Sequence, residues 1–173
     1  MLNSEIVFRD TYRLLCLYMA DKAIFEMTPP DQQVWGGSQR SEEPLFRLRH
    51  HLIEDEINHT LINLAICNRT HMELKKERHG REYPDSVCGK LIENNDEDMA
   101  KDLTFREACN KIIHAKRISG TFMESGTVKG FSGENAPMHH ELWLSGNYNK
   151  KDWIAELDVF EFLRVTTDNF ELI

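Results

Sequence analysis

The segment TFREACNKIIHA, residues 104–115, decides how this chain is layered. Thr104 followed by Glu107 has the spacing of a capping box, which predicts where a helix begins. The apolar residues after the cap recur at the spacing of a core-facing stripe: Phe105, Ala108, Cys109 and Ile112. The patterning upstream of this helix is helical and the patterning downstream is strand-like, so we expect the helix at the seam between two layers.

Three polar residues lie four apart on the same helix: Arg106, Asn110 and His114. We place them at the border of the apolar stripe and expect them to be partly buried. Partly buried polar groups need partners. In one interpretation Asn110 and His114 hydrogen-bond to backbone of the C-terminal part, and in the other they belong to an active site.

The chain before residue 104 is predicted to be helical. Residues 4–27 form one helix, and a long helix follows from an N-cap at Ser41, with no glycine until Gly80. A break of this long helix near Asn68 is an alternative, because an unbroken one is long for a single domain. A short helix is expected over residues 84–92, and a surface loop after it.

The chain after residue 115 changes character. Residues 116–138 are punctuated by glycine and are predicted to form short strand and loop. Residues 140–145 and 152–157 alternate as strands around a turn-rich segment, which predicts an antiparallel hairpin. Asp158, three residues before a glutamate, is expected to begin a short final helix.

Together these elements predict an α+β fold within a single domain, residues 1–173. Residues 1–115 form the helical layer with three main helices, and residues 116–173 form the β-rich C-terminal part. No repeat or low-complexity tract divides the chain. A length of 173 residues with 40% hydrophobic content is sufficient for one core.

Composition limits the classes of function. The formal net charge is -8, so the overall field disfavours nucleic acid and anionic membranes, although a local basic patch is not excluded by it. No apolar run reaches the roughly 18 residues needed to span a bilayer, and the first residues do not have the pattern of a signal peptide. We expect a cytoplasmic protein. The four cysteines form no Cys-x-x-Cys pair and are expected to be reduced: Cys16, Cys67, Cys88 and Cys109.

Metal binding is an alternative that the long helix raises. His51, Asp55 and His59 recur every four residues, and Glu56 with His59 has the Glu-x-x-His spacing of di-iron bundles. Those bundles use two such motifs and the chain has one, so a polar helix edge with charge pairs is the other interpretation. The run of residues 139–141, His-His-Glu, is a further candidate that would need a distant ligand. We expect no cofactor.

The late helix carries one resemblance to a known family. Asn110-Lys-Ile-Ile-His114 in a mainly helical protein resembles the HEPN superfamily, many of whose members are metal-independent ribonucleases of toxin and antiviral systems. The resemblance implies an arginine and a histidine acting together on the scissile phosphate, with four to six residues between them. Arg106 and His114 have seven residues between them, and Asn110 occupies the place of the expected arginine. An inactive relative that binds a partner fits the resemblance as well.

The sequence therefore predicts a small interaction protein without catalysis of its own, which binds a protein partner or itself and belongs to a prokaryotic defence or toxin-antitoxin system. Aromatic residues expected outside the core mark the surface: Trp35, Phe131 and Tyr148. A ribonuclease that uses His114 and Arg106 is the alternative, and metal binding is the second alternative. Neither the partner nor the role of the glycine-rich residues 120–133 follows from the sequence.

Overall fold

The computed structural model describes most of the chain, namely residues 4–33, 35–36, 39–80, 86–93, 96–124, 127–130, 138–149 and 151–170. For residues 35–36, 39–40, 79, 97, 121–124, 127–130 and 138 it describes the backbone alone. The α-helices of these ranges are α1 (Ser4–Met27), α2 (Pro44–His79), α3 (Phe105–His114) and α4 (Val159–Phe170). The strands are β1 (Trp35–Gly36), β2 (Gln39–Arg40), β3 (Val87–Glu93), β4 (Lys101–Thr104), β5 (Arg117–Glu124), β6 (Thr127–Gly130), β7 (Met138–Tyr148) and β8 (Lys151–Asp158). Short 3-10 helices cover Pro30–Gln32 and Glu97–Met99.

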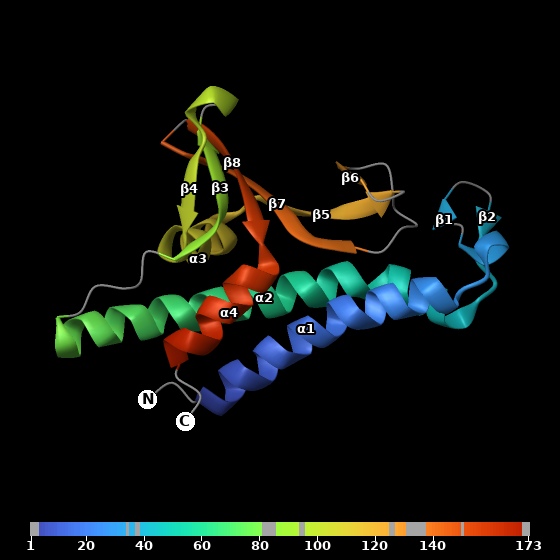
Figure 1. Ribbon diagram of the computed structural model, residues 1–173, viewed down its shortest axis with the longest axis horizontal. Helices are drawn as coiled ribbons and strands as arrows, with labels where there is room; N and C mark the ends of the chain where they lie inside the picture. The colour runs from blue at the N-terminus through green and yellow to red at the C-terminus, as the bar shows by residue number, and fades with distance from the viewer. Residues whose placement is uncertain are drawn as a thin grey trace.

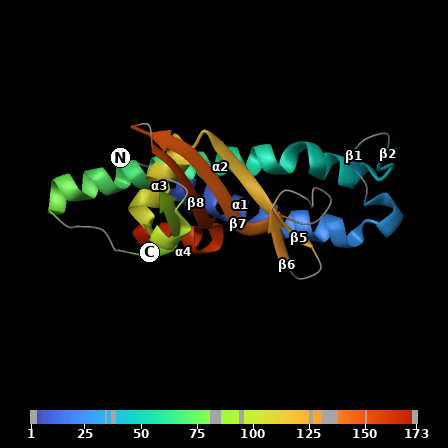
Figure 2. The ribbon, with the colours of Figure 1, turned by 90° about the horizontal axis from the view of Figure 1, so that it is seen from above.

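The helices and the main sheet form two layers, as the predicted α+β fold requires (Figure 1). α1 and α2 run antiparallel beneath a sheet whose strand order is β4-β3-β8-β7-β5-β6, with every pairing antiparallel. Seen from above, the sheet crosses over the helices (Figure 2). Side chains from all four α-helices and from the sheet share one buried cluster, so the two layers have a common core.

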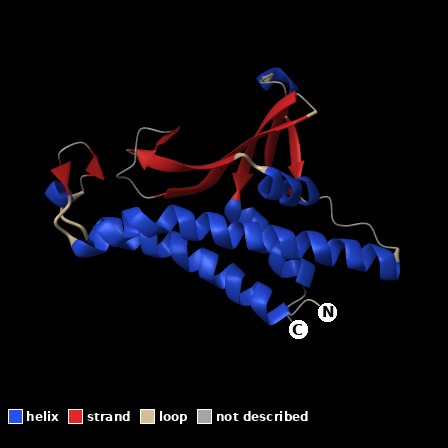
Figure 3. Ribbon diagram, turned by 180° about the vertical axis from the view of Figure 1, so that it is seen from behind, coloured by secondary structure: helices blue, strands red, loops and turns tan. Residues whose placement is uncertain are grey.

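Helix α3 confirms the predicted seam. It lies between α2 and the strands β3 and β4 (Figure 3), and all four residues of its apolar stripe are buried. The Thr104 hydroxyl accepts a hydrogen bond from the Glu107 backbone N–H at 3.4 Å and donates one to the Glu107 carboxylate at 3.3 Å. The cap and the stripe together fix where the helix starts and which side faces the core.

The predicted hairpin and final helix are also present. β7 pairs with β8 through residues 141–148, and the side chains of Trp153, Ala155 and Leu157 are all buried in the core. The Glu161 backbone N–H donates to Asp158 Oδ1 at 3.0 Å, which begins α4. The hairpin is the middle of a six-stranded sheet among the described residues, so the β part is larger than expected.

Helix α2 is continuous over 36 residues, about 54 Å, so the alternative of a break near Asn68 is wrong. Asn68 is buried inside the helix and donates to the backbone oxygen of Leu64 at 2.9 Å and to Thr166 Oγ1 of α4 at 3.0 Å. Asn169 of α4 donates to Asn68 Oδ1 at 3.1 Å. This asparagine therefore joins two helices instead of interrupting one.

The N-cap of α2 differs from the predicted one. Glu43 occupies the cap, and its carboxylate accepts from the Phe46 backbone N–H. Ser41 is buried two residues earlier, where its hydroxyl accepts from the Glu43 N–H at 3.1 Å. The predicted helix end is confirmed, because Gly80 adopts a left-handed conformation with φ of 63° and closes α2.

The helix predicted over residues 84–92 is wrong, because residues 87–93 form strand β3. The register between β3 and β4 shifts between Val87 and Lys90, as at a β-bulge, so Cys88 and Leu91 both face the core although they are three residues apart. This spacing imitates a helical period. Gly89 sits at the irregularity with φ of 143°, where a side chain would collide with the Glu156 carbonyl of β8. The loop expected next contains β4 instead.

A buried ion pair joins α1 to α2. Arg49 Nε lies 2.5 Å from Asp21 Oδ1, and the two side chains expose only 2% and 0% of their surface. The guanidinium also lies over the rings of Phe25 and Phe46, at 5.6 and 5.3 Å from their centroids. Removing either charge would leave the other buried without its ion-pair partner.

All four cysteines belong to the described part and carry free thiols, as predicted. Burial raises the pKa of the Cys88 thiol to about 12 and raises the pKa of the Cys109 thiol as well. Cys67 is half-buried, and burial raises its pKa too. Cys16 on α1 is exposed. Three of the four thiols are thus held in their unreactive protonated form at neutral pH.

Candidate functional site

The three polar residues of α3 do not converge on a pocket. Arg106 and His114 are exposed, and only Asn110 is half-buried, so the expectation of partial burial is wrong for two of the three. At about 100° per residue, Arg106 is roughly 110° and His114 roughly 170° from the middle of the apolar stripe, which places both on the solvent side. Asn110 Oδ1 is buried and has no hydrogen-bond partner within the described part of the chain.

Of the three aromatic residues predicted to mark an interaction surface, only Tyr148 has a described side chain. It is exposed at the end of β7, beside a cavity of about 280 Å³ whose other lining is mainly charged: Glu93, Lys111, Asn149, Lys151, Asp152 and Trp153. The backbone of Trp35 pairs with Arg40 in β1 and β2, but its side chain is not described, and Phe131 lies outside the described residues.

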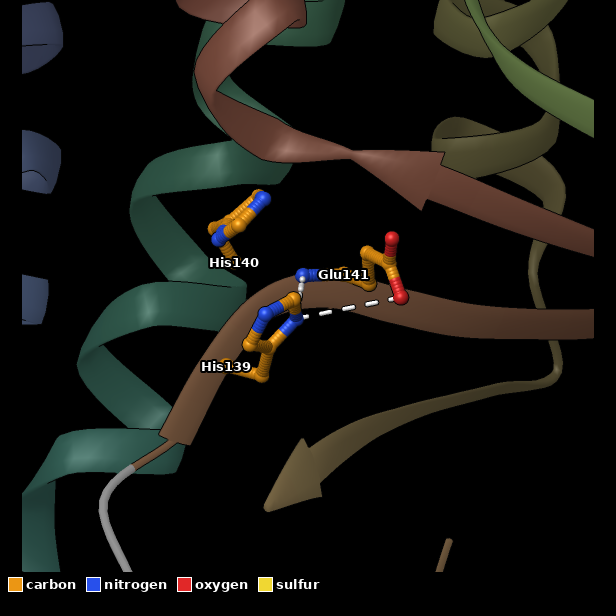
Figure 4. Close-up of side chains that lie close together, drawn as sticks. All are labelled: His139, His140 and Glu141. Carbon is orange, nitrogen blue, oxygen red and sulfur yellow. Dashed lines mark hydrogen bonds and ion pairs between the residues drawn. The ribbon is translucent and has the colours of Figure 1, made fainter. Parts of the chain in front are cut away.

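The predicted metal ligands of α2 are not brought into one group. His51 and His59 are exposed, His51 packs edge-on against the ring of His50, and His59 Nε2 lies 3.5 Å from Asn63 Nδ2. Within the part of the chain that the structure describes, the one group of potential ligands that lie within 4.8 Å of one another is His139, His140 and Glu141. Figure 4 shows these three side chains at the start of β7.

This histidine group already has structural partners. His139 Nδ1 accepts the Glu141 backbone N–H at 3.2 Å and lies 3.8 Å from the Glu141 carboxylate, as the dashed lines of Figure 4 mark. Burial lowers the pKa of His139, which keeps its ring neutral. The His140 ring stacks on Phe160 with 4.8 Å between centroids. One ring nitrogen of His139 therefore accepts a hydrogen bond, and the His140 ring packs β7 against α4.

An apolar groove lies between α1 and α4, with a volume of about 590 Å³. We call this hollow the groove. Its lining is almost entirely apolar, with one arginine and two threonines: Phe8, Thr11, Tyr12, Leu15, Met19, Phe160, Leu163, Arg164 and Thr167. The Thr11 hydroxyl is buried beneath this lining, with no hydrogen-bond partner among the described residues. No side chain in the lining forms a catalytic pair, so the groove is suited to binding.

The groove exists because α1 is apolar on two sides. The inner face of the helix packs on α2 and the sheet through Val7, Leu14, Tyr18 and Asp21, all of them buried. An outer stripe, consisting of Phe8, Tyr12, Leu15 and Met19, faces the groove. Its spacing of four, three and four residues is that of a helix seam that receives another helix. Tyr12, Leu15 and Met19 remain exposed although they are large and apolar.

The outer stripe is visible in the sequence as a helical period, but the aromatic residues predicted to mark the interaction surface do not belong to the stripe. Residues 8, 12, 15 and 19 carry the same period as the inner face, and a helix with two apolar stripes has two faces to cover. The fold covers one of them and places α4 along the edge of the other.

No protein-family model matches the chain, and no curated protein or solved structure matches it either. The resemblance of α3 to the HEPN superfamily therefore stays a prediction. None of the helices in the described ranges has both the length and the apolar character needed to cross a membrane.

Proposed function

We propose that this protein is an interaction module that docks an amphipathic helix of a protein partner in the groove between α1 and α4, without catalysis of its own. The observation that carries the proposal is the outer stripe of α1: four apolar side chains at helix-seam spacing that line an apolar hollow, three of them exposed. Amphipathic helices recognised in this way insert side chains at the matching three-and-four spacing.

Covering the outer stripe contributes free energy to docking. Tyr12, Leu15 and Met19 are partly exposed to water, and covering a large apolar side chain contributes on the order of 1.5 kcal/mol. Arg164 and Thr167 of α4 are polar residues of the groove lining. Polar groups of this kind orient a ligand, while the apolar lining supplies affinity.

We further propose a cytoplasmic location, for which the four free thiols are the support, because a reducing compartment keeps cysteines unpaired. A role in a prokaryotic defence or toxin-antitoxin system is part of the same proposal. It rests on the HEPN resemblance of α3, in the form of an inactive relative that binds a partner.

The test is selection of ligands on the intact protein. A displayed library of amphipathic helical peptides is selected on the immobilised protein, and each selected peptide is then measured against Met19→Glu and Tyr148→Ala. We expect peptides with apolar residues three and four apart that lose at least about tenfold in affinity on Met19→Glu and bind Tyr148→Ala unchanged. Recovery of no binding peptide, or of peptides indifferent to Met19→Glu, would contradict the proposal.

A ribonuclease remains the alternative, because Arg106 and His114 are exposed and accessible to a polymer such as RNA. They lie eight positions apart along one helix, which is about 12 Å of axial rise. A shared phosphate would therefore need a cation from a second molecule, as across a dimer interface. Metal binding is the second alternative. It has support in the 4.8 Å grouping of His139, His140 and Glu141, and elemental analysis of the purified protein tests it.

A further inference from the structure

The outer stripe of α1 is symmetric about its own midpoint. The positions 8, 12, 15 and 19 are centred between residues 13 and 14, and the same spacing extends outward by three residues to Glu5 at one end and Lys22 at the other. A stripe with this spacing reads the same in both directions. It therefore fits a copy of itself that runs the opposite way.

We propose that the helix docked in the groove is α1 of a second copy of this chain, packed antiparallel about a two-fold axis through the midpoint of the stripe. This inference rests on the proposed function and names its partner. In this register Tyr12 of each copy packs against Leu15 of the other, and Phe8 packs against Met19. The interface is isologous, so every contact occurs twice.

The charges at the ends of the stripe select the antiparallel direction. Glu5 and Lys22 are both exposed and, like Phe8 and Met19, lie at equal distances on either side of the midpoint of the stripe. Antiparallel pairing therefore brings each Glu5 opposite a Lys22, whereas parallel pairing would bring like charges together at both ends. Opposite charges beside an apolar seam set the partner and the direction of paired helices.

The present partner of Lys22 does not prevent this contact. Lys22 Nζ lies 3.8 Å from Glu26 on the same helix, and both side chains are more than half exposed. Exposed pairs of this kind stabilise a helix only weakly, so the ammonium group is free to turn toward a second molecule. Helix α1 has 24 residues, about 36 Å, which accommodates all six layers from residue 5 to residue 22.

Charge reversal tests the direction of pairing. The protein is compared with Glu5→Lys, Lys22→Glu and the double variant by sedimentation over a range of concentrations. We expect a dimer for the natural chain, a dissociation constant raised at least about tenfold by each single change, and recovery in the double variant. Single changes without effect, or a double variant that stays as weak as the singles, would overturn the antiparallel register.

Cross-linking tests the register directly. In a Cys16→Ser background, Glu5→Cys and Lys22→Cys are prepared separately and then mixed under oxidising conditions. We expect disulfide-linked dimers only in the mixture, since two copies of position 5 would lie about 25 Å apart in this register. Dimers of Glu5→Cys alone would overturn it.

The two proposals fail in distinguishable ways. If the protein sediments as a monomer at every concentration while selected peptides still bind the groove, the self-pairing inference is overturned and the proposed function stands. If the protein is a monomer and no peptide binds it, both the self-pairing inference and the proposed function are overturned.

Discussion

The two faces of α1 have similar sequence patterns and different consequences. The inner face carries Val7, Leu14, Tyr18 and Asp21 into the core, and there Asp21 meets Arg49 with both side chains almost fully buried. The outer stripe carries Phe8, Tyr12, Leu15 and Met19 toward a hollow that the rest of the described chain does not fill.

An apolar stripe on a helix therefore does not by itself indicate whether it stabilises the fold or binds a partner. The inner face is covered by residues distant in sequence; Asp21, for example, pairs with Arg49, which lies 28 positions away. The outer stripe is completed only in part, by Phe160 and Leu163 of α4. Substitutions on the inner face should therefore lower the free energy of unfolding, whereas those at the exposed residues Tyr12 and Met19 of the outer stripe should mainly change association.

The largest effect is expected from Asp21→Ala. The change leaves the Arg49 guanidinium buried without its carboxylate, which costs about 3–5 kcal/mol of unfolding free energy. Urea denaturation followed by circular dichroism measures it. The matched control replaces both residues, Asp21→Leu with Arg49→Met, and should recover most of the loss. A single variant as stable as the natural protein would show that the pair does not hold α1 on α2.

The next effect is expected from Met19→Glu, which should weaken association about a hundredfold, because a carboxylate then enters the apolar groove. Its melting temperature should stay near that of the natural chain, since Met19 contributes to no buried cluster. Leu48→Glu on α2 is the matched control, because Met19 exposes 53% of its surface and Leu48 exposes 52%. If Leu48→Glu weakens association and Met19→Glu does not, the binding surface lies on α2.

A smaller effect separates two tyrosines of nearly equal exposure, Tyr12 at 69% and Tyr148 at 71%. Tyr12→Ala removes an aromatic ring from an apolar lining and should weaken association by about 1–2 kcal/mol. Tyr148→Ala removes a ring from charged surroundings and should change nothing measurable. Titration calorimetry with a peptide from the selection decides between the groove and the surface predicted from the sequence. If only Tyr148→Ala weakened peptide binding, the interaction surface predicted from the sequence would be supported instead of the groove.

The smallest effect is expected from His114→Ala. His114 is exposed at the end of α3, so the unfolding free energy should change by less than about 0.5 kcal/mol. The same variant tests the ribonuclease alternative: if the natural chain cleaves RNA, His114→Ala must abolish the cleavage while His59→Ala, on α2, preserves it. Absence of cleavage by the natural chain would remove this alternative.

The parts of the fold that local sequence rules govern were predictable. Thr104 with Glu107, Asp158 with Glu161 and the alternation through Trp153 each fix a boundary or a face within a few residues, and the structure confirms all three. Such signals arise from contacts between near neighbours, so a single sequence contains them.

The errors have a common origin in long-range contacts. At β3 the bulge makes Cys88 and Leu91 follow a helical spacing, and only the neighbouring strands β4 and β8 reveal a strand. The pairing of Asp21 with Arg49 leaves no local trace either. For α3, by contrast, the position of His114 could have been derived, because its angle from the apolar stripe follows from residue spacing alone.

The positions of the cysteine thiols allow separation of the helical and sheet layers to be followed by chemical labelling. Cys16 is exposed beside the outer stripe, while Cys88 and Cys109 are shielded by the shared core and have raised pKa values. An alkylating reagent should therefore mark Cys16 at once and the core cysteines only when the two layers separate. The mass of the labelled protein then distinguishes molecules labelled only at Cys16 from molecules whose core has opened. Slower labelling of Cys16 at high protein concentration would indicate that the groove is occupied.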